Sequence, residues 1–296
     1  MDKKDCIKIY FTDFWDGFKP EYYYIYGILS RKYQLVIDEK SPDYLIFSCF
    51  GNNHLNYHNS IKIFWSGENF FPDFNQCDYA MGCFYLELGD RFLRIPEWTF
   101  YSIDWLYDKS LLLDEATLLN RKFCNFVYSN SFCADPFRMQ FFKRLSKYKQ
   151  VDSGGKLENN IGGCVADKVY FIAGYKFTIA FENSRADGYT TEKLIQPMYV
   201  NSLPIYWGNP SVHLDFNIES MVYVKNYDAM EEAIAEIIAL DNDDVAYLEK
   251  LRKPWFLNEE FKNMEKKVTD FLCHIIEQDR EKVIRRAKYG RNFYTV

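Results

Sequence analysis

Short apolar runs separated by polar or glycine-containing turns recur through the first hundred residues of the chain. Runs of this length, each followed by a polar turn, are typical of parallel strands buried beneath crossover helices. A helix-like stretch lies over residues 21–32, and the pattern therefore predicts a doubly wound sheet. Its expected strands cover residues 6–11, 35–37, 44–49, 61–65 and 79–82.

A second series of the same kind begins near Phe123. Asp135 and Pro136 open a helix, because Asp is a favoured N-cap residue and Pro suits the first helical turn. The clearest amphipathic helix covers residues 228–240, with Ile234 and Ile237 on its apolar face. The other expected helices cover residues 136–145, 167–175 and 191–200, and the expected strands cover 125–129, 150–152, 177–181, 203–207 and 221–224.

Two sheet-forming halves of similar length, joined through residues 105–122 without a low-complexity linker, indicate two domains. A chain of 296 residues is also long for one hydrophobic core, since single cores stop growing at about 250 to 300 residues. We expect an α/β fold in which two Rossmann-like domains face each other across a cleft, with ligands at the carboxyl ends of the strands. The expected boundaries are 1–115 for the N-terminal domain, 116–255 for the C-terminal domain and 256–296 for a helical segment that packs back on the N-terminal domain.

Composition and charge narrow the class of partner. A formal net charge of -6 disfavours nucleic acid, because its recognition rests on broad basic surface. Aromatic residues make up 19% of the chain, and some of them are expected to line a sugar-binding groove, where flat apolar faces are favoured. The opening residues are too polar for a signal peptide, and no apolar run approaches the roughly 20 residues that span a bilayer. We expect a cytoplasmic protein or a catalytic fragment.

The eight cysteines and four histidines show no pattern of metal ligands. No Cys-x-x-Cys pair occurs, which predicts reduced and mostly buried cysteines. His54 and His58 are four residues apart and could share a helix face, but the asparagines around them favour a loop. The histidines and cysteines therefore predict no metal site.

The densest polar cluster covers residues 181–193, between an apolar strand and a predicted helix. Its end, residues 188–193, is a strand-to-helix turn whose free N–H groups favour an anion, and a diphosphate is the natural occupant. Lys193 in the first helical turn is electrostatically unfavourable without a nearby anion, so we interpret it as a phosphate ligand. Taken alone, the cluster is equally compatible with a solvated helix start. Residues 203–210 are expected to form a second wall of the site, with Ile205 and Tyr206 in a purely structural role.

The segment FENSRADGYTTEKLIQPMYVNSLPIYWGNPSV resembles the signature of the alpha-1,3/4-fucosyltransferase family, glycosyltransferase family 10. The resemblance to bacterial members extends over roughly residues 5 to 255. It implies the two-domain GT-B fold, GDP-fucose as the donor and inversion at the anomeric carbon. The upstream segments that carry it lie at residues 64–69, 78–82, 90–96 and 135–138.

The resemblance also assigns roles to single residues. Glu68 matches the family's general base, in the domain that binds the acceptor. Arg138 and Lys193 can neutralise the departing diphosphate, while Glu192 can accept hydrogen bonds from ribose hydroxyls. No Asp-x-Asp motif stands beside these residues to hold a divalent ion, so we expect no metal and no required cofactor. The positions of the C-terminal domain that match the family's donor-binding residues are Arg138, Asn183, Tyr189, Glu192 and Lys193.

The acceptor stays open at this stage. Transfer to O3 of GlcNAc or Glc in N-acetyllactosamine, its 1,3-linked isomer, a glucose-terminated oligosaccharide or a lipopolysaccharide chain would fit, in Lewis-type glycan synthesis. Aromatic residues at 11–18, Trp15 above all, are expected to help choose it. Two other functions remain alternatives: a GT-B transferase with another nucleotide-sugar donor, and a non-catalytic protein that binds carbohydrate or sugar nucleotide.

The end of the chain combines an apolar stripe with a basic terminus. Phe261, Val268 and Leu272 belong to the stripe, which predicts a helix after residue 255. Packing of this helix on the N-terminal domain is the preferred interpretation, and peripheral contact with the inner face of a membrane is the alternative. The basic residues beyond the stripe are Arg280, Lys282, Arg285, Arg286, Lys288 and Arg291.

Overall fold

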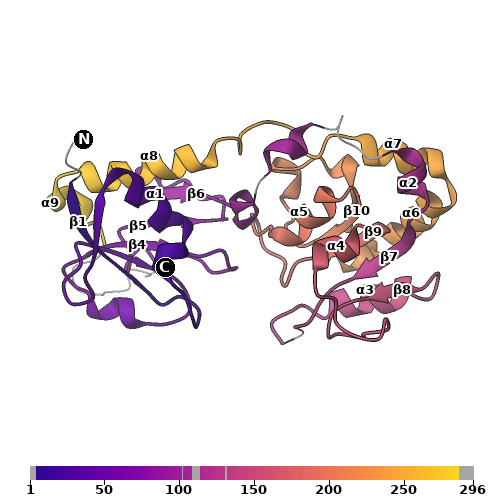
Figure 1. The fold of residues 1–296 in the computed structure, drawn as a ribbon, viewed down its shortest axis with the longest axis horizontal. Helices are drawn as coiled ribbons and strands as arrows, with labels where there is room; N and C mark the ends of the chain where they lie inside the picture. Colours follow the sequence, from indigo (N-terminus) through magenta and orange to yellow (C-terminus); the bar gives the residue numbers. More distant parts are fainter. Residues whose placement is uncertain (1–4, 102, 109–113, 131, 287–296) are drawn as a thin grey trace. The chain divides into compact units, whose positions relative to one another are not determined.

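The computed structural model describes residues 5–101, 103–108, 114–130 and 132–286. The chain forms two compact units, each built around its own sheet (Figure 1). The first unit comprises Met1–Pro96 together with Asn263–Val296, and the second comprises Glu97–Lys262.

The sheet of the first unit has six strands in the order β2-β1-β3-β4-β5-β6, and every neighbouring pair is parallel. All five residues of β4 and all four of β5 are buried, which explains why these strands are apolar apart from the buried Lys62. The strands are β1 (Cys6–Thr12), β2 (Gln34–Ile37), β3 (Tyr44–Phe47), β4 (Ile61–Trp65), β5 (Tyr79–Gly82) and β6 (Phe92–Arg94). The helices are α1 (Tyr24–Lys32), α8 (Met264–Glu277) and α9 (Arg280–Val283), with 3-10 turns η1 (Pro20–Tyr22), η2 (Asn53–Asn56) and η3 (Gly89–Arg91).

The sheet of the second unit has five parallel strands in the order β11-β10-β9-β7-β8. All seven residues of β9, its central strand, are buried. The strands are β7 (Lys122–Phe126), β8 (Val151–Ser153), β9 (Tyr175–Phe181), β10 (Leu203–Trp207) and β11 (Val222–Tyr223). The helices are α2 (Glu115–Leu119), α3 (Phe137–Leu145), α4 (Lys168–Ile172), α5 (Glu192–Tyr199), α6 (Met230–Asn242) and α7 (Asp244–Arg252). The 3-10 turns are η4 (Glu97–Phe100), η5 (Asp104–Tyr107), η7 (Val212–Leu214), η8 (Ile218–Ser220) and η9 (Tyr227–Ala229).

The first unit ends at Pro96, earlier than the boundary at residue 115 that we expected. Trp98 explains the difference, because it is fully buried against aromatic rings of the second unit. Its ring centroid lies 4.8 Å from that of Phe216 and 4.6 Å from that of Phe261. The same contacts hold residues 256–262 in the second unit, so the chain returns to the first unit only at Asn263.

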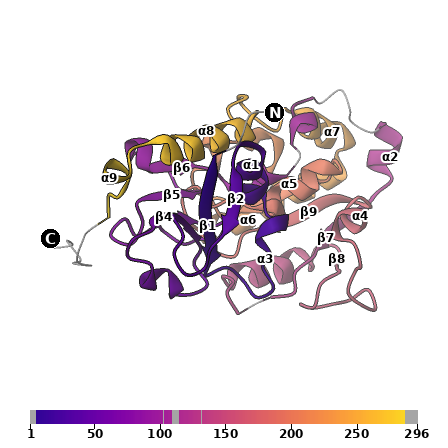
Figure 2. The same ribbon diagram turned by 60° about the vertical axis from the view of Figure 1, so that its left-hand side comes forward.

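The C-terminal helices α8 and α9 belong to the first unit, and α8 lies beside α1 (Figure 1, Figure 2). Arg31 and Lys32 of α1 pair with Glu265 and Glu277 of α8 at 2.7 and 2.6 Å. The apolar stripe is buried, as Val268, Leu272 and Ile275 show.

Four of the basic residues proposed for membrane contact are held in ion pairs within the first unit, and the pair of Lys282 with Asp279 at 3.2 Å is local. Arg280 pairs with Asp43 at 3.0 Å, Arg285 with Asp90 at 2.5 Å, and Arg286 with the fully buried Asp78. These pairs support packing of the segment on the first unit. Lys288 and Arg291 lie outside the described residues. Among the described residues, no helix combines the length and the apolar character needed to cross a membrane.

Candidate active site

In the sheet of the second unit, the order of successive strands reverses between β7 and β9. These two strands are neighbours although β8 lies between them in sequence. From β7 the chain moves outward to β8 on one side, and from β9 it moves to β10 on the other. Such a switch point leaves space for a ligand at the carboxyl ends of the two strands. The segments that follow β7 and β9 therefore frame the candidate site.

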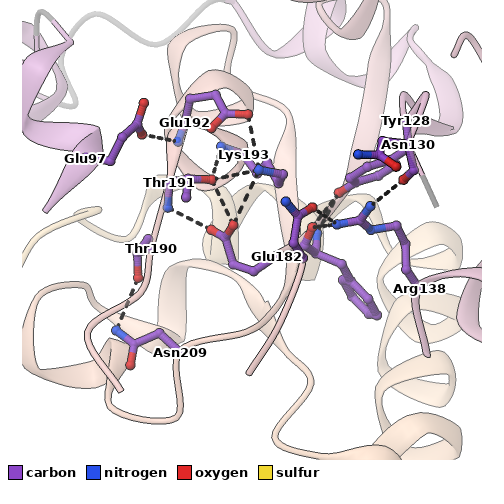
Figure 3. A network of polar contacts seen from close by, with 12 residues as sticks. Glu97, Tyr128, Asn130, Arg138, Glu182, Thr190, Thr191, Glu192, Lys193 and Asn209 are labelled. Atoms are coloured by element: carbon purple, nitrogen blue, oxygen red, sulfur yellow. Dashed lines mark hydrogen bonds and ion pairs between the residues drawn. The ribbon is translucent and has the colours of Figure 1, made fainter. Parts of the chain in front are cut away.

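Arg138 lies at this switch point and is only 2% exposed. Its Nη2 donates to Asn183 Oδ1 at 2.8 Å and to the Phe181 carbonyl at 3.1 Å. Its guanidinium carbon lies 4.0 Å from the centroid of the Tyr128 ring (Figure 3). Among the described residues no carboxylate pairs with Arg138, and its buried Nε has no hydrogen-bond partner. A buried cation without a counter-charge is unfavourable, so this arrangement suits an anionic ligand.

Lys193 lies in the same network, on the first turn of α5 (Figure 3). Its Nζ lies 3.0 Å from Thr191 Oγ1, 3.4 Å from Glu192 Oε1 and 3.6 Å from Glu182 Oε2. Burial by itself lowers the pKa of Lys193, but Glu182 and Glu192 more than offset this and raise the pKa above its ordinary value. The sequence suggested a diphosphate as the anion beside Lys193. In the structure, the carboxylates of Glu182 and Glu192 also lie beside it.

The fully buried Glu182 fastens the loop that leads into α5. Its Oε1 accepts from the Thr191 backbone N–H and its Oε2 from the Thr191 hydroxyl, both at 2.8 Å. Gly208 has φ +154° and lies so close that a Cβ there would be 2.4 Å from Glu182 Cγ. The close approach explains the glycine and keeps the loop rigid, which preorganises the N-terminus of α5.

Asn209 and Tyr189 complete the second wall of the site. Asn209 Oδ1 accepts from the Gly188 N–H at 2.9 Å, and its Nδ2 donates to Thr190 Oγ1 at 3.2 Å. Tyr189 between them is 2% exposed. The Gly-Asn-Pro turn after β10 therefore holds the loop before α5, and Ile205 and Tyr206 are fully buried in the strand.

Two charged groups of the site were missed in the sequence. Glu97 Oε2 accepts from the backbone N–H of Glu192 at 2.9 Å, and burial followed by the charges of Glu192 and Glu182 raises the pKa of Glu97 to about 7. Burial lowers the pKa of Lys168, and Lys168 together with Lys193 holds the pKa of Glu192 below its ordinary value although burial opposes this. Both residues lie outside the polar cluster at residues 181–193, so no neighbouring motif indicated them. Glu97 follows the segment 90–96, and Lys168 begins the short helix α4.

All five donor-site candidates belong to the second unit, whereas Glu68 and Trp15 belong to the first. Glu68 is exposed on the loop after β4, and its backbone N–H donates to Ser66 Oγ at 3.0 Å. Trp15 is 46% exposed, and its ring makes edge contacts with the rings of Phe18 and Tyr23.

No group of three metal-binding side chains occurs in the part of the chain that the structure describes. The one Asp-x-Asp pattern in the sequence consists of Asp241, in the last turn of α6, and Asp243, between α6 and α7. Asp241 accepts from Tyr148 and Lys149, each at 2.9 Å, and Asp243 caps α7 through the Ala246 N–H. This pattern therefore has structural partners of its own.

Two family models match the chain. The model described as alpha-(1,3)-fucosyltransferase FucT N-terminal domain matches residues 9–101. The model described as glycosyltransferase family 10 (fucosyltransferase), C-terminal part, matches residues 119–291. The chain belongs to glycosyltransferase family 10. The resemblance found in the sequence is thereby confirmed.

Curated relatives and solved structures agree with this family. The alpha-(1,3)-fucosyltransferase FucT of Helicobacter pylori is 33% identical over 269 residues, which cover 77% of this chain and 55% of the relative. The chain thus spans about half the length of that protein. A putative fucosyltransferase, R654, of Acanthamoeba polyphaga mimivirus is 32% identical over 154 residues, covering 47% of this chain and 25% of the relative.

Crystal structures of an alpha1,3-fucosyltransferase are similar to this chain over most of its length. The complex with GDP-fucose has a TM-score of 0.79 and 27% identity, covering 97% of this chain and 94% of that chain. The complex with GDP has a TM-score of 0.77 and 29% identity, covering 93% and 92%. The expected GT-B fold class, with two parallel-sheet α/β regions, is confirmed.

Proposed function

We propose that this chain transfers L-fucose from GDP-fucose to a hydroxyl of a carbohydrate acceptor, with inversion at the anomeric carbon. The observation that carries the proposal is Arg138, a buried cation at the switch point of the second unit whose hydrogen bonds, among the described residues, go to neutral groups. A bound diphosphate supplies the missing negative charge. Family membership and the GDP-fucose complex of the similar solved protein support fucose as the sugar.

In this proposal the second unit holds the donor. Arg138 and Lys193 contact the diphosphate and stabilise the charge that develops on it as the fucosyl bond breaks. Glu192 accepts hydrogen bonds from the ribose hydroxyls, since Lys193 and Lys168 keep its pKa low and its carboxylate charged. Asn183 fixes the guanidinium plane of Arg138 through their 2.8 Å hydrogen bond, and Tyr189 lines the donor pocket.

The first unit supplies the base and the acceptor site. Glu68 takes the proton of the acceptor hydroxyl as that oxygen attacks the anomeric carbon from the face opposite the leaving diphosphate. A single displacement of this kind inverts the configuration of fucose. Trp15 presents an exposed ring face on which an acceptor sugar can pack. We propose O3 of GlcNAc or Glc as the hydroxyl, in acceptors such as N-acetyllactosamine.

Transfer assays with labelled GDP-fucose test this function. N-acetyllactosamine, its 1,3-linked isomer and lactose serve as acceptors, and NMR of the product gives the linkage position and the anomeric configuration. Calorimetric titration of GDP, UDP and CMP separates a GDP-sugar enzyme from transferases that use another nucleotide. Tight binding of UDP or CMP but not GDP contradicts the donor, and binding of GDP without turnover on any acceptor contradicts the catalytic role.

A further inference from the structure

A left-handed residue shapes the carboxyl end of the sheet in the first unit. Asp13 follows β1 directly and has φ +60°, a left-handed conformation that is uncommon for residues other than glycine and that Asp adopts more readily than most. Its Oδ1 accepts from the Asn53 N–H at 2.8 Å, and its Oδ2 accepts from the His54 N–H at 2.9 Å. The carboxylate of Asp13 thus fixes the loop that follows β3. Because β1 and β3 are neighbours and β2 lies outside β1, this is the switch point of the first sheet.

A pocket of about 510 Å³ opens beside this loop, which is within the usual range for small-molecule sites, about 300 to 1,000 Å³. Three of its lining residues keep about half of their surface in solvent: Phe50 (51%), Phe70 (51%) and Phe71 (58%). The Phe71 ring is stacked on Phe84, with 3.8 Å between centroids, which holds its other face toward solvent. The entrance of the pocket is therefore aromatic and ordered.

The deeper part of the pocket is polar. His54 is 5% exposed there, with Nδ1 2.6 Å from Asp13 Oδ2 and Nε2 2.9 Å from Gln76 Oε1. Ser48 also lines the pocket and is 2% exposed, yet its hydroxyl has no hydrogen-bond partner among the described residues. Buried hydroxyls in native proteins are nearly always paired, so an unpaired one in the wall of a pocket points to a ligand.

The residues that line the pocket indicate the chemical class of that ligand. None of the described lining residues is Lys or Arg, and the ring of His54 is already occupied by Asp13 and Gln76, which argues against a phosphate. Exposed aromatic faces above a hydroxyl and an amide fit the apolar faces and the hydroxyls of a neutral pyranose. We infer that this pocket is a carbohydrate subsite that holds one neutral hexopyranose unit of the acceptor, with Ser48 bonded to one of its hydroxyls.

This inference rests on the proposed function and extends it to residues that no motif indicated. Phe70 connects the subsite to the base, because its backbone N–H donates to the Glu68 carbonyl at 2.7 Å. A sugar packed on Phe70 therefore lies next to the loop that carries Glu68. Trp15 does not line the pocket, but its ring packs edge-on against Phe50 with 6.3 Å between centroids, so the two surfaces would contact neighbouring units of one oligosaccharide.

Two substitutions test the subsite directly. Ser48→Ala removes a hydroxyl that has no protein partner, so folding is preserved, and the Kd of an occupying sugar rises by about threefold to tenfold. Phe71→Ala removes the stacked ring and raises this Kd by about fivefold or more. The probes are lactose and N-acetyllactosamine, titrated by ligand-observed NMR with and without saturating GDP.

Matched controls come from elsewhere in the chain. Ser146→Ala removes another buried hydroxyl that has no partner in the described part of the structure, and Tyr22→Ala removes an aromatic ring that is 83% exposed in the first unit. Both should leave sugar binding unchanged. GDP binding is measured separately by calorimetry, so a protein that binds sugar but not GDP counts against the proposed donor and not against the subsite. Absence of sugar binding to the wild type, or wild-type affinity in both pocket variants, overturns the inference.

Discussion

The carboxylate of Glu97 accepts a hydrogen bond from the backbone N–H of Glu192 at 2.9 Å, at the first residue of α5. Glu97 lies in η4 and reaches a helix that starts almost a hundred residues later in the chain. The contact satisfies a free N–H of the helix end, but it also adds a third carboxylate to a region that already holds Glu182 and Glu192. The charge on Glu97 should therefore affect any anion bound beside Lys193.

The first prediction concerns GDP affinity and pH in Glu97→Gln. Burial and the neighbouring carboxylates raise the pKa of Glu97 to about 7, so the side chain is neutral below that pH and charged above it. We expect GDP affinity of the variant to exceed that of the wild type at pH 8 by about threefold to tenfold, and to match it at pH 5.5. The glutamine oxygen still accepts from Glu192, so the helix end is preserved. Calorimetry at both values measures the difference.

Stability should follow the same titration. The folded pKa of Glu97 lies above its ordinary value of 4.5, so its contribution is full below pH 4.5 and is lost as pH rises through about 7. Glu97→Gln should thus melt at a higher temperature than the wild type at pH 8 and at a similar one at pH 5. Glu249→Gln, a change on the exposed surface, is the control. A constant ratio of GDP affinities across this pH range would exclude titration of Glu97 near neutrality.

The second prediction separates binding from stability at Arg138. Replacement of Arg138 by Met fills a similar volume and removes a buried charge that has no carboxylate partner among the described residues. The ligand-free variant should melt at or above the wild-type temperature, because an uncompensated buried charge is unfavourable. GDP affinity should fall by about tenfold to a hundredfold, since charge-assisted contacts to the diphosphate are lost.

Arg144→Met is the matched control for Arg138→Met. Arg144 lies on the same helix, α3, and pairs with Glu231 at 2.5 Å on the surface, where such pairs contribute little. It should change neither GDP affinity nor melting temperature appreciably. If Arg138→Met binds GDP as the wild type does, the diphosphate lies elsewhere.

Most of the fold could be predicted from the sequence, because the buried parallel strands are short and mainly apolar, even where a lysine interrupts them. The strands at 61–65, 79–82 and 203–207 were predicted with their observed bounds. β6 and α7 were not predicted. β6 has three residues, and only Phe92 is buried. In α7 the buried residues lie among charged ones. Neither sequence therefore shows a clear periodicity of apolar positions.

The donor-site candidates after β9 could be predicted because they are continuous in sequence, from a strand through a loop to a helix. Glu97 could not, because its approach to Glu192 depends on the packing of η4 against α5. The first unit ends at Pro96 and not at residue 115 for a similar reason, since the burial of Trp98 among distant aromatic rings is a tertiary contact. The local sequence pattern was thus sufficient to predict the loop and helix after β9. It was not sufficient to predict Glu97, whose charge acts on that loop through a tertiary contact.

The third prediction concerns metals. Arg138, Lys193 and the N-terminus of α5 together offset the charge of a diphosphate, so we expect transfer activity to persist in EDTA. The rate in excess chelator should be at least half of that in buffer alone. Loss of activity in EDTA that is restored by manganese or magnesium would show that a divalent ion takes part, and the aspartates 241 and 243 would then deserve mutation as possible ligands.

The last prediction concerns Glu68, and the structure reduces the number of rival bases. Asp90 is engaged by Arg285 and His274, which hold its pKa at about 2 in spite of partial burial, so it is a poor proton acceptor. Asp73 accepts from the Asn75 N–H at 2.9 Å, but it also lines the pocket inferred to hold an acceptor sugar, so it stays a rival. Glu87 is exposed, as Glu68 is, and also stays a rival.

Glu68→Gln keeps the shape of the side chain but cannot take a proton. Because Glu68 is exposed, and because its 3.0 Å contact to Ser66 Oγ is made by the backbone, melting temperature should be unchanged. GDP affinity should also be unchanged, since the proposed donor residues belong to the second unit. Turnover at saturating substrates should fall by about 10² to 10⁴, the usual effect of losing a positioned base. Glu87→Gln and Asp73→Asn, prepared in parallel, should retain most of it. Turnover of Glu68→Gln above about a tenth of the wild-type rate would rule out Glu68 as the base, and a large loss in Glu87→Gln or Asp73→Asn would identify its replacement.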